Sequence, residues 1–98
     1  MAMLHIAVQT ALTEAGFEPV KGDPSNRWRW EGAGQHGDTM ITVQPVLRGG
    51  TEPRVYISTY CQALEPRGVN SVIYAEDDLA EQEDAALVLL FKHLVRAA

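Results

Sequence analysis

Residues 54–62, RVYISTYCQ, decide how this chain folds. Apolar and polar side chains alternate along the stretch, with Val55 and Ile57 on one face and Tyr56 and Tyr60 on the other. An alternation with a period of two is typical of a β-strand that has one buried and one open face. We therefore expect a strand here, in a sheet of which only one face is covered.

Further strands are predicted on both sides of this one. Residues 26–31 and 39–47 alternate in the same way, and residues 17–20 and 71–74 are shorter candidates. Pro45 cannot donate to a ladder, so it marks an edge or a bulge. The segments between the strands carry the glycines and prolines of turns and loops: 22–25, 32–38, 48–53 and 65–68. Such short connections favour an antiparallel meander.

Helices are predicted at both ends of the chain. Residues 2–15 place apolar side chains at helical spacing, leave Ile6 outside that stripe, and are followed by Gly16, a typical helix end. The last helix is expected to begin near Asp78, because Asp78 followed by Glu81 resembles a capping box. Its apolar arc spans about 200° at 100° per residue, which is wider than packing on one sheet face requires.

These elements predict an α+β fold with two layers. A helix, three or four strands of an antiparallel meander and a second helix follow one another, and both helices cover one face of the sheet. Residues 1–98 are expected to form a single compact domain, since a chain of this length buries one core. The other face of the sheet would be open to solvent or to a partner.

The negative charge of the chain is concentrated in one short segment. Residues 76–84 contain six acids and no base, whereas residues 1–75 contain seven acids and six bases. The six acids are Glu76, Asp77, Asp78, Glu81, Glu83 and Asp84. Two interpretations stay open. Acids stabilise a helix N-terminus by about 0.3–1 kcal/mol each, but two or three suffice. The other acids of this segment would suit electrostatic docking to a protein with a basic surface.

The open sheet face is a second candidate surface. The side chains expected on it are Arg27, Arg29, Tyr56 and Tyr60. This assignment follows because the two tryptophans of residues 26–31 most simply point inward. Tyrosine and arginine stack on single-stranded bases, and they also dominate protein hot spots. Ordinary cross-strand packing, in which these side chains cover one another, is the structural explanation.

The wide apolar arc of the last helix has two explanations. The helix either packs on both the sheet and the first helix, or part of the arc meets a second copy of the chain. The possible dimer face consists of Leu87, Val88, Phe91 and Val95.

No motif for catalysis or for metal binding is recognisable. Gly32 to Gly37 matches G-x-G-x-x-G, but that motif binds a dinucleotide only when a helix follows it, and residues 39–47 alternate like a strand. His5, His36 and His93 lack the spacing of metal ligands. The chain also shows no nucleophile with a base and an orienting group. We therefore expect no enzyme, no metal and no cofactor.

The single cysteine and the short apolar runs favour a cytoplasmic protein. Cys61 is the only cysteine, so no internal disulfide implies an oxidising compartment. The longest apolar run, residues 85–91, is far shorter than the roughly 18 residues of a membrane span. The first residues lack the basic and apolar pattern of a signal peptide. No membrane partner is expected.

The sequence thus predicts a small acidic, non-enzymatic protein-binding module that covers a surface of its partner. Adaptors, immunity proteins and inhibitors act in this way, for example a phage-type inhibitor of a nucleic-acid-handling complex. The alternative is a small single-stranded nucleic-acid-binding protein that uses the arginine and tyrosine face. Net acidity makes nucleic acid the less favoured partner. A homodimer is compatible with both hypotheses.

Overall fold

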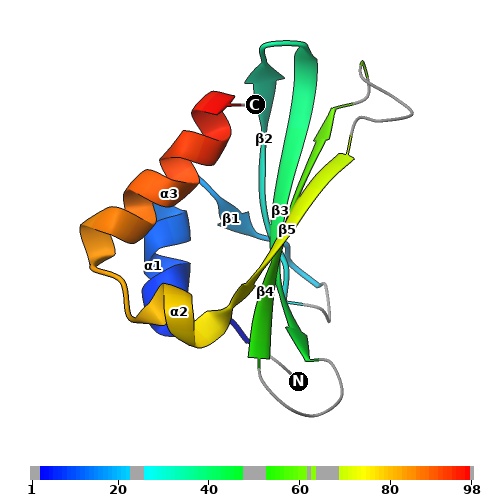
Figure 1. Ribbon diagram of the computed structural model, residues 1–98. Helices are drawn as coiled ribbons and strands as arrows, with labels where there is room; N and C mark the ends of the chain where they lie inside the picture. The colour runs from blue at the N-terminus through cyan, green and yellow to red at the C-terminus, as the bar shows by residue number, and fades with distance from the viewer. Residues whose placement is uncertain (1–2, 23–25, 48–52, 62, 64–68, 98) are drawn as a thin grey trace.

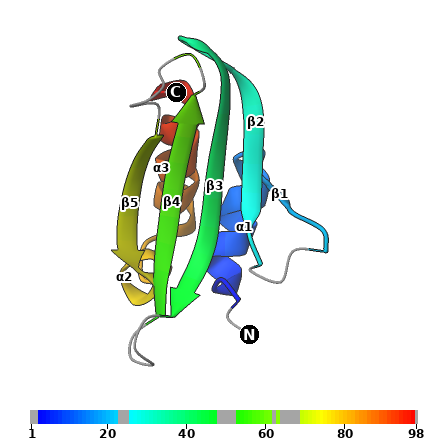
Figure 2. The same cartoon turned by 90° about the vertical axis from the view of Figure 1, so that its right-hand side faces the viewer.

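Five strands form one antiparallel sheet in the part of this chain that the structure describes. The computed structural model describes residues 3–22, 26–47, 53–61, 63 and 69–97. In chain order the elements are α1 (Ile6–Glu14), β1 (Glu18–Pro19), β2 (Trp28–Gly34), β3 (Gly37–Leu47), β4 (Pro53–Cys61), β5 (Val69–Ala75), α2 (Glu76–Ala80) and α3 (Asp84–Ala97). The strands follow one another in the order β1-β2-β3-β4-β5, and each neighbouring pair is antiparallel (Figure 2). The predicted α+β meander is confirmed.

The described residues form five strands rather than the three or four predicted, because the short candidate at residues 17–20 does contribute an edge strand. At one edge β1 is only two residues long, and Glu18 pairs with Arg29 while Pro19 pairs with Trp28. Two residues are too few to show a period, so this strand depends on β2 rather than on its own pattern. At the other edge, β5 is seven residues long, against the four predicted.

The helices and the sheet form two layers. Figure 1 shows α1, α2 and α3 on one side of the sheet, and none of the helices that the structure describes lies on the other side. The layers enclose a core of buried apolar side chains, in which the rings of Phe17 and Phe91 meet edge to face, 6.0 Å apart. The largest fully buried side chains are Phe17, Phe91, Leu12, Ile41, Leu79, Leu87, Val8, Val43 and Val55. The inward position of the alternating strand residues follows the predicted pattern.

Helix α1 is shorter than predicted at its start. It begins at Ile6 rather than at residue 2, because His5 is its N-cap and the Nδ1 atom of that side chain accepts a hydrogen bond from the backbone N–H of Ala7, at 3.1 Å. The helix ends before Gly16, as predicted, and this glycine has a φ of 97° that few other residues adopt. Ile6 is 69% exposed, also as predicted.

The prediction of one continuous C-terminal helix starting near Asp78 was wrong. The structure has two helices separated by residues 81–83, and Asp78 lies inside the first turn of α2. The N-cap of α2 is Ala75, without a side-chain hydrogen bond, so the capping box is wrong too.

A continuous helix is opposed by charge and by packing. Like charges three or four residues apart repel along a helix, and residues 76–84 would contain several such pairs. At 100° per residue, Leu79 would also point about 120° away from Phe91. With the break, both side chains are fully buried.

The glycine-rich segment predicted as a loop is part of a hairpin. Strand β2 continues to Gly34 and β3 begins at Gly37, with a two-residue turn between them. Gly37 has a φ of 111°, which explains a glycine there. Gly32 lies against Trp30, since a Cβ atom at this position would be 2.6 Å from the Cζ2 atom of the ring. These glycines therefore have structural roles, and no helix follows the motif.

Pro45 lies in a part of β3 that pairs with only one neighbouring strand. The pairing of β2 with β3 begins at Trp28 and Val43, so at Pro45 the partner is Val55 of β4 alone. The predicted edge position of this proline is thus confirmed locally. Within the described part of the chain, no helix is long and apolar enough to cross a membrane.

Candidate interaction surfaces

The open sheet face has an apolar hollow around Tyr56. Strand register places Tyr56 between Gln44 of β3 and Ile73 of β5. Together with Val46 and Arg54, these residues line a surface hollow of about 340 Å³. Ile73 is 51% exposed and Arg54 is exposed. This end of the face combines an aromatic ring, aliphatic side chains and one cation.

Tyr60 lines a second hollow on the same face. Register places Tyr60 beside Met40, and Met40 beside Glu31. The hollow has a volume of about 510 Å³, and Glu31 and Asp38 also line it. Two carboxylates therefore lie near this tyrosine. Tyr60 lies four positions further along β4 than Tyr56, which is about 13 Å along the strand.

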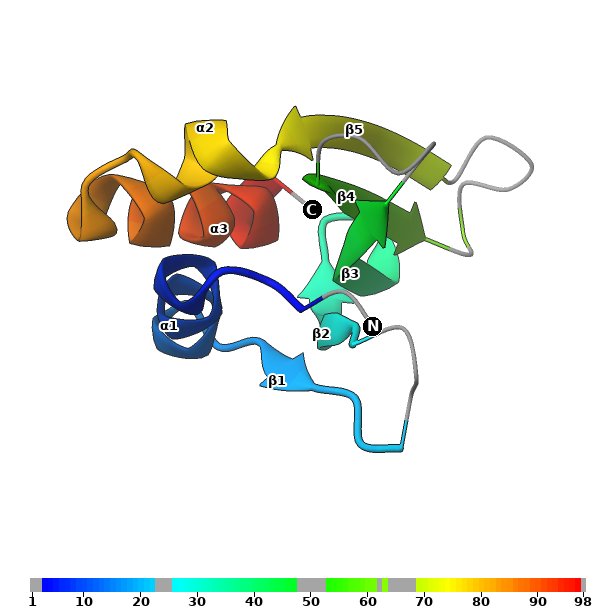
Figure 3. The same cartoon turned by 90° about the horizontal axis from the view of Figure 1, so that it is seen from below.

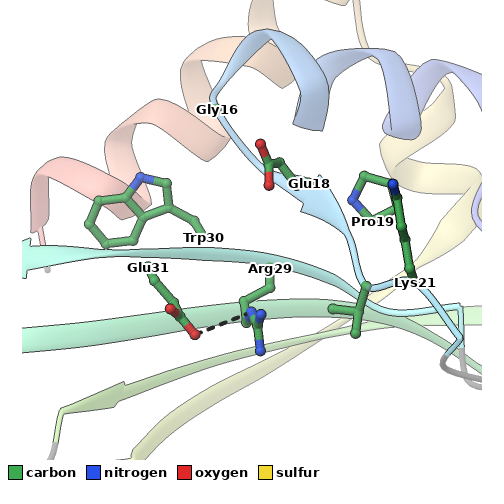
Figure 4. Close-up of a pocket in the computed structure, with 8 residues that line it drawn as sticks. Gly16, Glu18, Pro19, Lys21, Arg29, Trp30 and Glu31 are labelled. Carbon is green, nitrogen blue, oxygen red and sulfur yellow. Dashed lines mark ion pairs between the residues drawn. The ribbon is translucent and has the colours of Figure 1, made fainter.

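The structure brings only one of the two predicted arginines to the open face. Arg29 is exposed there, and its Nε atom lies 3.2 Å from Oε1 of Glu31. The dashed line in Figure 4 marks this ion pair. Arg27 precedes β2 and lines a separate hollow together with Leu4 and Gln9. The predicted set of four thus divides into three residues on the open face and Arg27 outside it.

The open face is not basic. Its described cations are Arg29 and Arg54. Its described acids are Glu18, Glu31 and Asp38, since Glu18 pairs with Arg29 and Asp38 pairs with Ala33 in the strand register. Arg54 was missed by the sequence analysis, although the alternation of residues 54–62 already placed it beside Tyr56. Ile73 was missed because only the register of β5 with β4 shows its neighbours.

A hollow at the β1 edge has mixed charge (Figure 4). It has a volume of about 470 Å³ and lies where β1 meets β2. Its lining residues are Gly16, Glu18, Pro19, Val20, Lys21, Arg29, Trp30 and Glu31. These side chains supply charges of both signs, but none is a serine, cysteine or histidine that could act as a nucleophile or a neutral base.

The six predicted acids surround a bend between two helices. We call residues 76–84 the acidic elbow. Asp77 and Asp78 lie in the first turn of α2, and Asp84 lies in the first turn of α3. The run therefore contains two helix N-termini rather than one, and the helix dipole favours acids at both. Glu81 and Glu83 lie outside the two helices.

Glu76 differs from the other five acids. Its side chain is buried, and its Oε1 atom accepts a short hydrogen bond from the backbone N–H of His5. This contact joins the start of α2 to the N-cap of α1. The other five acids are exposed. Figures 1 and 3 place the elbow in the helical layer, on the side of the molecule away from the open sheet face.

The predicted dimer face is mostly covered by the chain itself. Leu87 and Phe91 are fully buried, and Val88 and Val95 are half-buried against the same core. Helix α3 packs on α1 and on β2, which accounts for its wide apolar arc. The large apolar residue that α3 exposes is Leu89.

Groups for metal binding do not gather in the described residues. No cluster of three or more histidine, cysteine, aspartate or glutamate side chains there could hold a metal ion. Cys61 is buried, with its Sγ atom 3.8 Å from the backbone oxygen of His36. His5 is used as the N-cap of α1.

Comparison with known proteins finds no relative of this chain. No protein-family model, no curated protein and no solved structure matches it. A functional proposal therefore rests on the chain's own residues.

Proposed function

We propose that this chain is a non-enzymatic protein-binding module that docks through its acidic elbow onto a basic protein surface. The observation that carries this proposal is the exposure of five carboxylates within residues 77–84, a segment without a basic residue. A compact group of like charges attracts a surface of opposite charge and speeds association with it.

The position of Glu81 supports a role beyond helix stability. Glu81 is the C-cap of α2, where the helix dipole disfavours a negative charge. Asp77, Asp78 and Asp84 have favourable positions in first turns, so their stabilising effect on the helices explains them. Glu81 has no such explanation.

The partner's chemistry follows from the charge of the elbow. A surface rich in lysine and arginine is the complement, and proteins that handle nucleic acid have such surfaces. By covering one of them, the chain would act as an inhibitor, an immunity protein or an adaptor. The cytoplasm as its compartment is part of the same proposal and rests on the single cysteine.

A single-stranded nucleic-acid binder is the second candidate. It is supported by Tyr56 and Tyr60, because each lines a hollow on the open face where a base could stack. The carboxylates beside Tyr60 and the ion pair of Arg29 with Glu31 oppose a polyanion on this face. The protein-binding proposal is therefore favoured.

The test neutralises the elbow without changing the rest of the surface. The variant combines Glu81→Gln, Glu83→Gln and Asp84→Asn. A control of equal net charge combines Glu14→Gln, Glu18→Gln and Asp38→Asn, whose acids are exposed outside the elbow. The tagged parent chain, the variant and the control are each used to capture partners from a lysate, with and without nuclease.

A protein that remains after nuclease treatment is then titrated with all three chains. Exposed ion pairs contribute roughly 0.2–1 kcal/mol each, so losing three lowers the affinity on the order of tenfold. We expect this loss for the elbow variant alone, and weaker binding of the parent chain as salt rises. Equal affinities for the variant and the control would refute docking through the elbow.

The nucleic-acid candidate is tested by titrating a fluorescent single-stranded oligonucleotide at low ionic strength. Binding that falls with salt and with Tyr56→Ala and Tyr60→Ala would replace the protein-binding proposal. An absence of binding would eliminate the alternative.

A further inference from the structure

Strand β5 is an edge strand without the usual protection against pairing. Its residues Val69–Ala75 read VNSVIYA and contain neither a charge nor a proline. Native proteins commonly protect an exposed edge with lysine, proline, a bulge or a covering helix, because its free backbone groups invite another strand. Figure 2 shows β5 at one margin of the sheet, and no helix or strand of the described residues lies beyond it.

Two neighbouring apolar residues of β5 are exposed on opposite faces of the sheet. Val72 is 42% exposed and Ile73 is 51% exposed. Successive strand residues point to opposite faces. A ligand lying on one face would cover only one of these side chains, whereas an added strand would contact both. This arrangement therefore fits an extended chain that pairs with the edge.

The opposite edge of the sheet is protected. There β1 contributes Glu18 and Pro19, and the neighbouring strand β2 contributes the charged pair Arg29 and Glu31. Pairing of β5 with this edge of another copy would produce an open fibre, and the proline and the charges oppose it. Pairing of β5 with β5 instead uses the unprotected edge twice and closes after two copies.

We propose that β5 pairs antiparallel with the β5 of a second copy of this chain, so that two five-stranded sheets become one continuous sheet about a two-fold axis. In an antiparallel pair, the two residues that lie opposite each other point to the same face of the sheet. If all seven residues of β5 pair with the seven of the second copy, the central residue Val72 lies opposite the Val72 of that copy. Ile73 then lies opposite Ser71. Because the strand is uncharged, no like charges oppose one another across the axis.

The dimer is independent of the proposed function. Its interface uses β5, whereas the partner would bind the acidic elbow. It also differs in location from the dimer face predicted on α3. The two reactions respond oppositely to salt: screening weakens docking to a basic partner, but it strengthens association of two copies that each carry a formal charge of −5.

The test measures the mass of the full chain by sedimentation velocity from low micromolar to near-millimolar concentration, at low and moderate salt. We expect the mass to rise from 10.8 kDa towards about twice that value, and to rise further in salt. A lysine on an edge strand opposes pairing. Val72→Lys places two ammonium groups opposite each other, so the dissociation constant should increase by about tenfold or more.

Two further variants locate the interface. Ser71→Lys introduces the charge at an exposed position, so it tests the edge without removing an apolar contact, and it should also weaken the dimer. Leu89→Lys is the matched control, since Leu89 is 61% exposed on α3 and should not affect association. Circular dichroism verifies that each variant is folded.

Three results would overturn the proposal. The first is a mass of 10.8 kDa at every concentration. The second is a dimer that keeps its affinity in both Val72→Lys and Ser71→Lys. The third is a dimer that dissociates with Leu89→Lys, which would place the interface on α3.

Discussion

Replacing Gly32 with alanine should destabilise the protein through the ring of Trp30. A Cβ atom at position 32 would lie 2.6 Å from Cζ2 and 2.7 Å from Cη2 of that ring. Non-bonded carbon atoms are best separated by about 3.5–4.0 Å. The Trp30 side chain packs against the hydrophobic core, so the ring cannot move away without disturbing other contacts.

The expected free-energy change is the difference between two effects. Forcing an extra methyl group into a packed region costs about 1–3 kcal/mol. Alanine in place of glycine within a strand returns about 0.5–1 kcal/mol, because it restricts the unfolded chain. The two ranges together give a loss between roughly 0 and 2.5 kcal/mol. We therefore expect Gly32→Ala to lower the free energy of unfolding by about 1 kcal/mol, which corresponds to a decrease in Tm of about 4–8 °C.

Urea denaturation followed by tryptophan fluorescence measures this change, since Trp28 still reports unfolding when Trp30 is replaced. Gly32→Ala is compared in the parent chain and in a Trp30→Leu background, where the collision is absent, so most of the cost should disappear. Gly37→Ala is the control. Its Cβ would meet nothing within 4 Å, but its φ is 111°, so its cost should be the same in both backgrounds. An equal cost of Gly32→Ala in both backgrounds would refute the collision with Trp30.

Three further predictions test the roles of other side chains. Glu76→Ala should lower the free energy of unfolding, measured by urea denaturation, by roughly 1.5–3 kcal/mol, because the backbone N–H of His5 loses its acceptor. The control Glu81→Ala, at an exposed position, should change this free energy by less than about 0.5 kcal/mol. Phe91→Ala should cost about 3–5 kcal/mol by calorimetry because it empties a fully buried position, whereas Leu89→Ala, at an exposed position of the same helix, should cost little; equal losses would mean that α3 packs differently. The Cys61 thiol, which is buried, should react with a thiol reagent much more slowly in the native protein than in urea, and rapid native labelling would contradict its placement.

The local pattern predicted the faces of the long strands correctly. Val55 and Ile57 are buried and Tyr56 lies on the open face, because alternation in a strand depends only on neighbouring residues. The same pattern failed for residues 32–38, where glycine signals were interpreted as a loop. The glycines at 32 and 34 lie in a strand because Gly32 packs against the Trp30 ring and β2 pairs with β3. A local sequence pattern contains neither contact.

The sequence predicted which residues form the candidate surfaces, but it did not predict where these residues lie in the fold. The acidity of residues 76–84 is visible in the sequence, but the break after α2 decides that the run contains two helix N-termini. Burial likewise decides that Glu76 contacts His5 while Glu81 remains exposed. Arg27 and Arg29 share one alternation, yet Arg27 precedes β2 and lines a hollow with Leu4 and Gln9, whereas Arg29 lies on the open face.

The sequence by itself determined the α+β class, the meander and the side chains that share a strand face, because periodicity and short connections act between residues close along the chain. Only the tertiary structure decided which elements became neighbours. It made β5 an unprotected edge, covered Leu87 and Phe91, and set the acidic elbow apart from the open sheet face. These relations depend on strand register and on packing between residues that are distant in the sequence, and both are decided by the burial of one shared core.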